Sequence, residues 1–386
     1  MFSSSPKTIP PFGRIFCALF FFWIFSSVGC SAQWTQDLIR KLTISPTDTV
    51  SLVFFGDIMQ HGMQIKDAED RGFNYRPCFA AMIPAMQAAD LTIANIETTF
   101  AGRPYTGYPV FSAPDPLLPQ LKEFGVGVLL TANNHIGDKG VLGLKRSLHL
   151  LDSTGVSHTG LFRSAEERQQ RYPLMVERKG IRIAFLNCTY GTNGFTIPLP
   201  YLVNRLDTVQ MAQDIRKAQR QGADFIVACM HWGDEEKLQY NDRQKALAEF
   251  LFRHGVDMVI GAHPHVPQDM ELRYHPNGEI KQVLAYSLGN MVSNQPFPNT
   301  QIGLKLEIKL IKSGFYKRIY SFTHEWIVTE WQVEGGLRRH YILPLEQAGK
   351  VSESVRISPE GRPRGTVDFV INELPGKRVY SIQKQK

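Results

Sequence analysis

The stretch VIGAHPHVPQ (residues 259–268) places two histidines directly after a short apolar run. A near-continuous apolar run is typical of a strand that is covered on both faces. Burying an imidazole is costly unless it has a partner, so the histidines indicate a site at the end of this strand. In an extended chain, side chains two residues apart point to the same side. We therefore expect His263 and His265, with Pro264 stiffening the turn between them, to converge on one site.

The same arrangement recurs along the whole chain. Short β-branched runs followed by polar residues are VSLVFFGD (50–57), DLTIANIE (90–97), VGVLLTANNH (126–135), IRIAFLNCTYG (181–191), DFIVACMHWG (224–233) and QVLAYSLGN (282–290). Helical patterns between them are PCFAAMIPAMQAA (77–89), GVLGLKRSLHLLDSTG (140–155), TVQMAQDIRKAQRQG (208–222) and DRQKALAEFLFRHG (242–255). We expect Pro84 to bend or interrupt the first helix, and the other three to close at Gly155, Gly222 and Gly255. Alternating strands and helices predict an α/β layered fold.

The composition and charge exclude several classes of protein. The 386 residues are 43% hydrophobic and 20% charged, without repeats or low-complexity tracts, as in a globular protein. The net charge of +7 is spread along the chain. No basic helix carries interleaved aromatic residues, so nucleic-acid binding is not expected.

The N-terminus has the pattern of an export signal. A weakly basic start precedes the apolar run IFCALFFFWIF (15–25), which is short for a membrane span, and small residues follow. The stretch SVGC (27–30) resembles a lipoprotein box with Cys30 as the lipidated residue, although Ser27 stands where an aliphatic residue is commoner. Cleavage after Ala32 and an uncleaved anchor are the alternatives. The remaining cysteines (Cys78, Cys188 and Cys229) do not suggest a disulfide scaffold.

The domain organisation follows from these patterns. We expect a leader over residues 1–30, one catalytic-type domain over 50–345, and a loosely held C-terminal tail over 346–386. The segments IGLKLEIKLI (302–311) and YSFTHEWIVTEWQV (320–333) alternate like strands and are expected to belong to the same domain without chemistry of their own.

The polar residues that could bind a ligand or take part in catalysis all lie at or just after the end of a predicted strand. They are Asp57, Glu97, His135, His231, His263 and Asn290. In α/β folds the carboxyl ends of the strands form the ligand-binding edge. Asp57, Glu97, His231 and His263, together with Asn134 and His265, make a mixed carboxylate, imidazole and amide-oxygen set, which suits two divalent ions such as Zn, Mn or Fe. Two such ions can activate a water molecule and stabilise displacement at phosphorus.

The motifs GD, NIE, NNHIGDKG, HWGDE, GAHPHVPQ and YSLGN, in this order, resemble the poly-γ-glutamate capsule-synthesis proteins of CapA type. That family is similar in turn to the calcineurin-like metallophosphoesterases. The resemblance covers about residues 52–294. It implies a four-layer α/β/β/α sandwich of metallophosphoesterase type, with the metal site between the strand ends.

The resemblance also implies roles for single residues. Asp57 resembles the first-motif aspartate on one ion, which His265 would share, and Glu97 stands at the bridging position. Asn134, His231 and His263 resemble the ligands of the other ion. His135 matches the histidine that protonates the leaving group, and Asp138 can orient it.

Two positions depart from the phosphoesterase pattern. Met59 stands where the first motif usually carries histidine, and His61 is a candidate substitute with different spacing. The bridging position holds glutamate, whose arm is longer than that of aspartate. Both departures bear on the first ion and on whether phosphoester cleavage is retained.

Simpler interpretations exist for each of these residues. The histidine pair can belong to a solvated loop, His231 can be a core histidine and His135 a structural hydrogen-bonding residue. Asp57 and Glu97 can cap helices, and Asn133, Asn134 and Asp138 can form turns. The residues expected at the edge of the site, touching substrate or supporting the ligands, are Asn95, Asn133, Asp234, Glu235 and Asn290.

These expectations combine into an exported, membrane-anchored, metal-dependent hydrolase of the cell envelope. The resemblance implies that it acts in synthesis or export of an anionic capsule polymer, on a phosphoester or polymer substrate, beside a membrane capsule synthase. One alternative keeps the two ions but cleaves or transfers a γ-glutamyl amide. The other is a non-catalytic scaffold of a capsule synthase, which the altered first motif favours and the retained metal-type residues disfavour.

Overall fold

The computed structural model describes residues 49–314, 316–348 and 367–384. The described residues from Val50 onward form one compact unit. The predicted leader, with Cys30, lies outside the described residues. Within the described ranges, no helix has both the length and the apolar character that crossing a membrane requires.

One half of the central sheet is parallel. Its strands are β4 (Ser157–Thr159), β3 (Val126–Leu130), β2 (Leu91–Ile96), β1 (Thr49–Ile58) and the short β13 (Asn290–Val292) on β1. Each pairs in parallel with its neighbour, so their carboxyl ends lie on one side.

The other half is also mainly parallel. Its strands are β12 (Ile280–Ala285), β10 (Met258–Ala262), β9 (Phe225–His231), β7 (Ile181–Thr189) and the antiparallel edge strand β6 (Leu174–Arg178). The strands predicted from the apolar runs are therefore confirmed in both halves. A separate two-stranded sheet pairs β5 (Leu161–Phe162) with β8 (Leu202–Val203).

A long antiparallel hairpin joins the two halves. The strands β14 (Ile302–Ser313) and β15 (Tyr316–Glu334) pair along their length, and β16 (Leu337–Pro344) adds to the far side of β15. β14 lies next to β1, whereas β15 reaches β12 through the pair Ile280↔Ile319. The two segments predicted as additional strands are confirmed, and they connect the halves into one hydrogen-bonded sheet.

The helices cover the outer faces. They are α3 (Gly62–Asp70), α4 (Arg76–Phe79), α5 (Ile83–Ala88), α6 (Leu117–Glu123), α7 (Gly140–Thr154), α8 (Ala165–Arg171), α9 (Thr208–Arg220) and α10 (Asp242–Arg253), with a 3-10 turn at Leu345–Gln347. The predicted interruption at Pro84 is confirmed, because Pro84 lies in the first turn of α5 and α4 has already ended. α7 ends at Gly155, which adopts the left-handed conformation that glycine tolerates.

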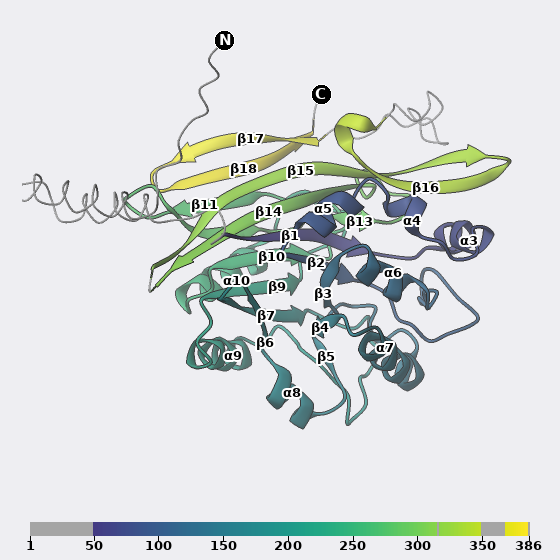
Figure 1. Cartoon of the computed structure of the whole chain (residues 1–386), viewed down its shortest axis with the longest axis horizontal. Helices are drawn as coiled ribbons and strands as arrows, with labels where there is room; N and C mark the ends of the chain where they lie inside the picture. Colours follow the sequence, from purple (N-terminus) through teal and green to yellow (C-terminus); the bar gives the residue numbers. More distant parts are fainter. Residues whose placement is uncertain (1–48, 315, 349–366, 385–386) are drawn as a thin grey trace, which may run out of the picture. The chain divides into compact units, whose positions relative to one another are not determined.

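Three apolar clusters define the layers. The central cluster joins residues such as Leu52 and Ile93 of one half-sheet to Phe185 and Val227 of the other. A second cluster packs α5 and α6 on the first half, and a third packs α9 and α10 on the second half. The predicted four-layer α/β/β/α sandwich is confirmed. In Figure 1, β1, β7 and β9 all run toward the side where α3, α6 and α7 lie.

The C-terminal segment differs from the loosely held tail expected over 346–386. The strands β17 (Val367–Leu374) and β18 (Lys377–Lys384) form a hairpin, and β18 pairs with β11 (Met270–Tyr274), which itself pairs with β12. Tyr380 and Ile382 are buried. The segment contains few apolar residues before residue 367, but both strands contain several, and a Pro-Gly turn joins the strands, which is the pattern of a hairpin.

Candidate metal centre

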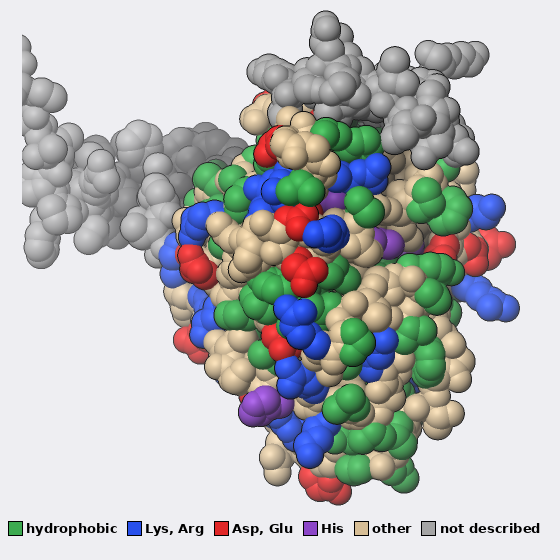
Figure 2. All heavy atoms as spheres, turned by 90° about the vertical axis from the view of Figure 1, so that its right-hand side faces the viewer, with side chains coloured by type: hydrophobic (Ala, Val, Ile, Leu, Met, Phe, Trp, Pro, Cys, Tyr) green, Lys and Arg blue, Asp and Glu red, His purple; other side chains and the backbone are tan. Residues whose placement is uncertain are grey.

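The carboxyl ends of both half-sheets meet at a cluster of buried polar residues. Asp57 is the second-last residue of β1, Glu97 directly follows β2 and His231 is the last residue of β9. Asn134 follows β3, and His263 and His265 follow β10; all six of these side chains are at most 4% exposed. Figure 2 views the side of the molecule toward which these strands run.

The potential ligand atoms lie close enough to share ions. Two groups with ligand atoms within 4.8 Å of one another are Glu97, His263 and His265, and Asp57, Glu97 and His231. Glu97 Oε1 is 3.5 Å from His231 Nε2 and 3.7 Å from His265 Nε2. Glu97 belongs to both groups, as a residue between two ions would.

The surroundings of Glu97 fit a bound cation. Both of its carboxylate oxygens are buried and accept no hydrogen bond from the described residues. Burial raises the pKa of Glu97 well above its ordinary value, and the neighbouring charge of Asp57 raises it further. A buried carboxylate without donors is costly. Divalent cations would remove this cost, so the donor set fits the metal that the motifs imply.

The imidazoles are also in the form that binds metal. Burial holds the pKa of His263 well below its ordinary value, and the nearby His231 lowers it further. Burial lowers the pKa of His231 to about 3. Both rings are therefore neutral near pH 7, and a neutral imidazole offers the nitrogen lone pair that a metal needs. His263 Nδ1 is buried and lacks a hydrogen-bond partner among the described residues.

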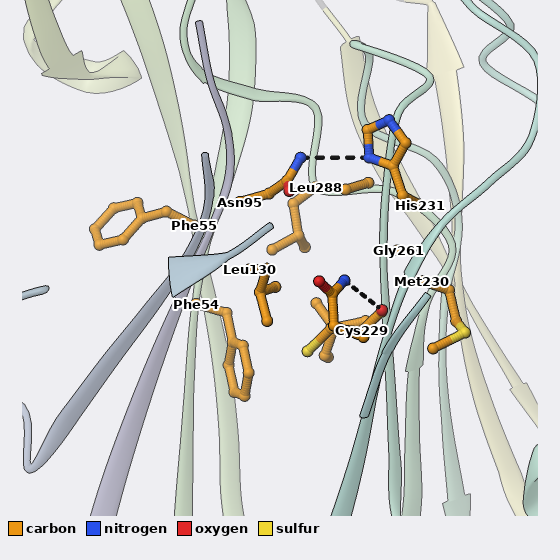
Figure 3. A pocket seen from close by; sticks show the side chains of 12 residues that line it. Phe54, Phe55, Asn95, Leu130, Cys229, Met230, His231, Gly261 and Leu288 are labelled. Carbon is orange, nitrogen blue, oxygen red and sulfur yellow. Dashed lines mark hydrogen bonds between the residues drawn. The ribbon is translucent and has the colours of Figure 1, made fainter. Parts of the chain in front are cut away.

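Two asparagines orient the surrounding ligands. Asn95 Nδ2 donates to Asp57 Oδ1 at 2.6 Å and lies 3.3 Å from His231 Nδ1. Asn290 Oδ1 is 3.1 Å from His265 Nδ1. Figure 3 shows Asn95 reaching His231 above a small apolar pocket between the half-sheets, where Phe54 and Leu130 face Cys229 and Gly261.

The histidine pair reaches the site in a different way from the one expected. β10 ends at Ala262, and His263 and His265 have positive φ angles of 99° and 59° rather than extended backbone. The expectation that strand alternation aligns them is wrong. Their rings, 5.9 Å apart, converge because the turn is contorted, which non-glycine residues adopt at a cost. The backbone N–H of His263 donates to Asp57 Oδ2 at 3.2 Å, which helps to hold this turn.

His135 lies beside the metal-type cluster with its orientation fixed. Its Nδ1 is 2.9 Å from Asp138 Oδ2, which also accepts the backbone N–H of Phe111 at 2.7 Å. The ring of Phe111 packs edge-on against His135 at 4.6 Å. Asn133 Oδ1 accepts the backbone N–H of His135 at 3.1 Å. With Nδ1–H donated to Asp138, Nε2 is the nitrogen available to exchange a proton with a ligand.

His61 and Met59 occupy different surroundings. His61 belongs to neither candidate metal group among the described residues. It precedes α3, and its Nδ1 lies 3.3 Å from both Gln64 Oε1 and the backbone N–H of Asn294. Burial lowers the pKa of His61 to about 4. Met59 is buried and its sulfur contacts Ser293.

The two acidic residues after β9, Asp234 and Glu235, differ in their relation to the cluster. Asp234 is exposed and accepts a hydrogen bond from Asn241 at 2.8 Å, next to the start of α10, so the structure does not bring it into the cluster. Glu235 is exposed too, but its charge raises the pKa of Glu97, after burial and Asp57. The charge of Glu235 is therefore close enough to the cluster to act on it.

Two residues of the site escaped the sequence analysis. Tyr190 follows β7 and its ring lies 4.5 Å from that of His263. Asn193 contacts Asn134 at 3.3 Å and His135 at 3.5 Å. Their position in the sequence could have identified them, because the predicted strand over 181–191 ends at the same edge of the sheet as the strands that carry the candidate ligands.

Comparisons with known proteins relate the chain to capsule synthesis. A family model described as "Bacterial capsule synthesis protein PGA_cap" matches residues 51–295. The "Capsule biosynthesis protein CapA" of Bacillus anthracis is 26% identical over 301 residues, which cover 74% of this chain and 70% of that protein. The "PGA biosynthesis protein CapA" of Bacillus subtilis (strain 168) is 29% identical over 288 residues, covering 71% of each.

Solved structures resemble the chain more distantly. The calcineurin-like phosphoesterase YfkN from Bacillus subtilis matches with a TM-score of 0.39 at 13% identity, covering 72% of this chain and 90% of that one. The NAD nucleotidase NadN from Haemophilus influenzae matches with a TM-score of 0.42 at 12% identity; the match covers 72% of this chain and 58% of that one.

Proposed function

This chain belongs to the bacterial capsule synthesis protein family, and from that premise we propose that it is an exported, metal-dependent phosphoesterase-like hydrolase. In this proposal it acts in synthesis or export of an anionic capsule polymer of the poly-γ-glutamate type. The observation that carries the hydrolase assignment is the burial of the Glu97 carboxylate, which has no hydrogen-bond partner among the described residues and belongs to two candidate metal groups. A scaffold has no use for such a residue, whose burial is costly in the absence of a cation.

Six side chains would hold the ions: Asp57, Glu97, Asn134, His231, His263 and His265. When bound, two divalent ions would supply Lewis-acid stabilisation of the phosphoryl oxygens and would activate water for attack. Asn95 and Asn290 hold Asp57 and His265 in place through their hydrogen bonds, and Asn95 also contacts the ring of His231.

His135 would be the general acid. Its Nδ1–H is held by Asp138, so Nε2 delivers the proton to the leaving-group oxygen. Phe111 restrains the ring from one side, and the backbone N–H of Phe111 keeps Asp138 in position. This arrangement resembles other sites in which a carboxylate fixes the tautomer and direction of a catalytic imidazole.

The export and anchoring parts of the proposal rest on the sequence SVGC (27–30). Lipidation of Cys30 would tether the domain to the membrane, next to a membrane-bound capsule synthase. Blocking the lipoprotein peptidase tests this, because the precursor should then run more slowly on a gel. Cys30→Ala should abolish that shift, and an unchanged wild-type band would contradict lipidation.

Elemental analysis combined with a substrate panel tests the hydrolase assignment. We expect the purified protein to contain transition metal and to hydrolyse phosphoesters. His135→Ala should lower kcat by about 10²- to 10⁴-fold while the metal content stays that of the wild type. The exposed His275 offers the matched control, since His275→Ala should change neither quantity.

Other results would redirect the assignment. Turnover of γ-glutamyl amides alone, by the same metal-loaded protein, would replace the phosphoester with an amide substrate. A folded protein that binds no metal would contradict the hydrolase and leave a structural role in capsule synthesis.

A further inference from the structure

The turn after β7 forms a wall of the candidate metal centre. β7 pairs with β9 so that Thr189 lies opposite His231, and the backbone N–H of Tyr190 donates to His231 O at 3.0 Å. The Tyr190 ring then lies 4.5 Å from the ring of His263 and is nearly parallel to that of His231. Tyr190 is 43% exposed, so it contacts the candidate ligands from the solvent side.

Asn193, in the same turn, forms hydrogen bonds to two residues of the site and contacts a third. Its Oδ1 accepts from Asn134 Nδ2 at 3.3 Å and from the Tyr190 hydroxyl at 3.4 Å. Its Nδ2 lies 3.5 Å from His135 Nδ1. Because Asn134 Nδ2 is turned toward Asn193, Asn134 Oδ1 is turned toward His231, at 2.8 Å from Nε2. Asn193 thereby determines which end of the Asn134 amide faces the centre.

The backbone of the turn suits this side chain. Asn193 has a φ of 47° and Gly194 a φ of 77°. Asparagine tolerates the left-handed region better than most non-glycine residues. A larger or β-branched residue would strain the turn and move the amide away from Asn134 and His135.

The carboxylates of the centre have no positive side chain as a partner. Among the described residues, the hydrogen bonds and ion pairs of Asp57 and Glu97 involve no lysine or arginine. Besides the ions, neutral donors can therefore hold an oxyanion here. The Tyr190 hydroxyl is one, since a phenol is protonated near pH 7, and its 3.4 Å contact with Asn193 is long enough to be exchanged for a better acceptor.

We propose that Tyr190 is a substrate-binding residue that donates its hydroxyl to an oxygen of the substrate's phosphoryl group, and that Asn193 is the positioning residue for Tyr190 and Asn134. This inference rests on the proposed metal-dependent function and specifies how the chain meets the anion. Arg205 supports the turn, because its guanidinium donates to Tyr190 O and to Thr192 Oγ1, each at 3.2 Å.

Orthophosphate binding to the metal-loaded protein tests Tyr190. Tyr190→Phe keeps the ring against His263 and removes only the hydroxyl. We expect calorimetry to show a Kd for orthophosphate about tenfold higher than that of the wild type, with unchanged metal content. Tyr320, an exposed tyrosine on β15, is the control, and Tyr320→Phe should bind phosphate like the wild type.

Metal affinity tests Asn193 independently of any substrate. Asn193→Gly accepts the left-handed backbone without strain, so a loss reports on the side chain alone. We expect its affinity for a divalent ion to fall by about tenfold or more. Asn193→Asp keeps an oxygen acceptor for Asn134 and Tyr190 and should retain the ion. Loss of the ion in Asn193→Gly together with its retention in Asn193→Asp would not result from a change of folding alone.

Each result bears on a different part of the inference. If Tyr190→Phe binds orthophosphate as tightly as the wild type, the substrate contact is wrong while the hydrolase assignment stands. If Asn193→Gly holds metal like the wild type, the positioning role is wrong. If the metal-loaded wild type neither binds orthophosphate nor cleaves phosphoesters, both the proposed function and the Tyr190 contact fail.

Discussion

Glu97 is the residue on which both candidate metal groups depend. Its carboxylate is buried without donors among the described residues, and burial holds the neighbouring imidazoles of His231 and His263 neutral. In water these groups would each be solvated, so the folded chain has removed their solvent partners before any ion binds. The cation is therefore the group that balances the site.

A series of single substitutions tests whether metal binding depends on Glu97. Glu97→Gln removes the charge shared by both groups and should lose most of the bound metal, whereas His231→Ala and His263→Ala should each weaken mainly one group and lose about half. Metal content per protein is the measurement. His275→Ala, at an exposed position, should lose none. Equal losses for all three site variants would contradict a shared Glu97.

The sequence predicts the site residues to different degrees. Asp57, Glu97, His231 and His263 were identifiable because each follows an apolar run whose end fixes its place at one edge. Tyr190 and Asn193 were not, because a turn's side chains are directed by local φ angles that apolar periodicity does not encode. The same reason explains the histidine pair, whose residues were predicted correctly but whose backbone conformation was not.

At the scale of elements, α3 is attached to β16 through a buried carboxylate. Asp67 accepts the backbone N–H of His340 at 2.7 Å and also bonds to Arg71 and Arg339. Burial opposes ionisation of Asp67, but these hydrogen bonds outweigh it and hold its pKa below the ordinary value. The carboxylate thus contributes stability above the pH at which the unfolded chain ionises.

Asp67→Asn should lower the free energy of unfolding by about 2 kcal/mol at pH 7. Because the folded pKa is depressed, the wild type should lose this contribution as the pH falls below about 4 toward the folded pKa, so the variant's deficit should shrink there. Urea unfolding at several pH values measures it. Asp70→Asn on the same helix, which breaks only a pair with the exposed Lys66, should change little. A deficit independent of pH would contradict the assignment.

The C-terminal hairpin is an element that composition alone misjudged. The side chain of Tyr380 on β18 packs into the central apolar cluster, whereas Ile371 on β17 is 55% exposed. The low apolar content of the segment suggested a loose tail. The suggestion was wrong because a strand that extends an existing sheet needs few buried residues of its own. Pairing with β11, distant in sequence, is a tertiary contact that local patterns do not reveal.

Tyr380→Ala should therefore lower the free energy of unfolding by about 3 kcal/mol. Ile371→Ala is the matched control and should cost less than about 0.5 kcal/mol, because its side chain is already exposed. Chemical denaturation of both variants is the measurement. Similar stabilities of the two variants would show that β18 contributes nothing to the core.

At the scale of the whole molecule, the site lies where two half-sheets meet. Asp57 and Glu97 come from one half, and His231, His263 and His265 from the other. The layered fold could be predicted from alternating strands and helices together with the family resemblance. The order of the strands could not, since the hairpin of β14 and β15 joins the halves through long-range pairings, including the pair Ile280↔Ile319.

Bound ions would stabilise this arrangement, because they bind the folded chain and not the separated strands. We expect a chelator to lower the Tm of the wild type by several degrees, and the loss to be restored by adding the metal back. Glu97→Gln should show little response to either treatment. A chelator that removes the metal without changing the Tm of the wild type would contradict coupling between the halves.

The distance in sequence between the ligands has a consequence for biogenesis. Asp57 and the backbone of His263, in direct contact in the folded protein, are separated by 206 residues, so a growing chain that has not yet reached His265 lacks part of the set. Any ion would therefore complete its coordination only after most of the chain has been made and both half-sheets have come together, and the compartment in which this happens would decide which cation is available.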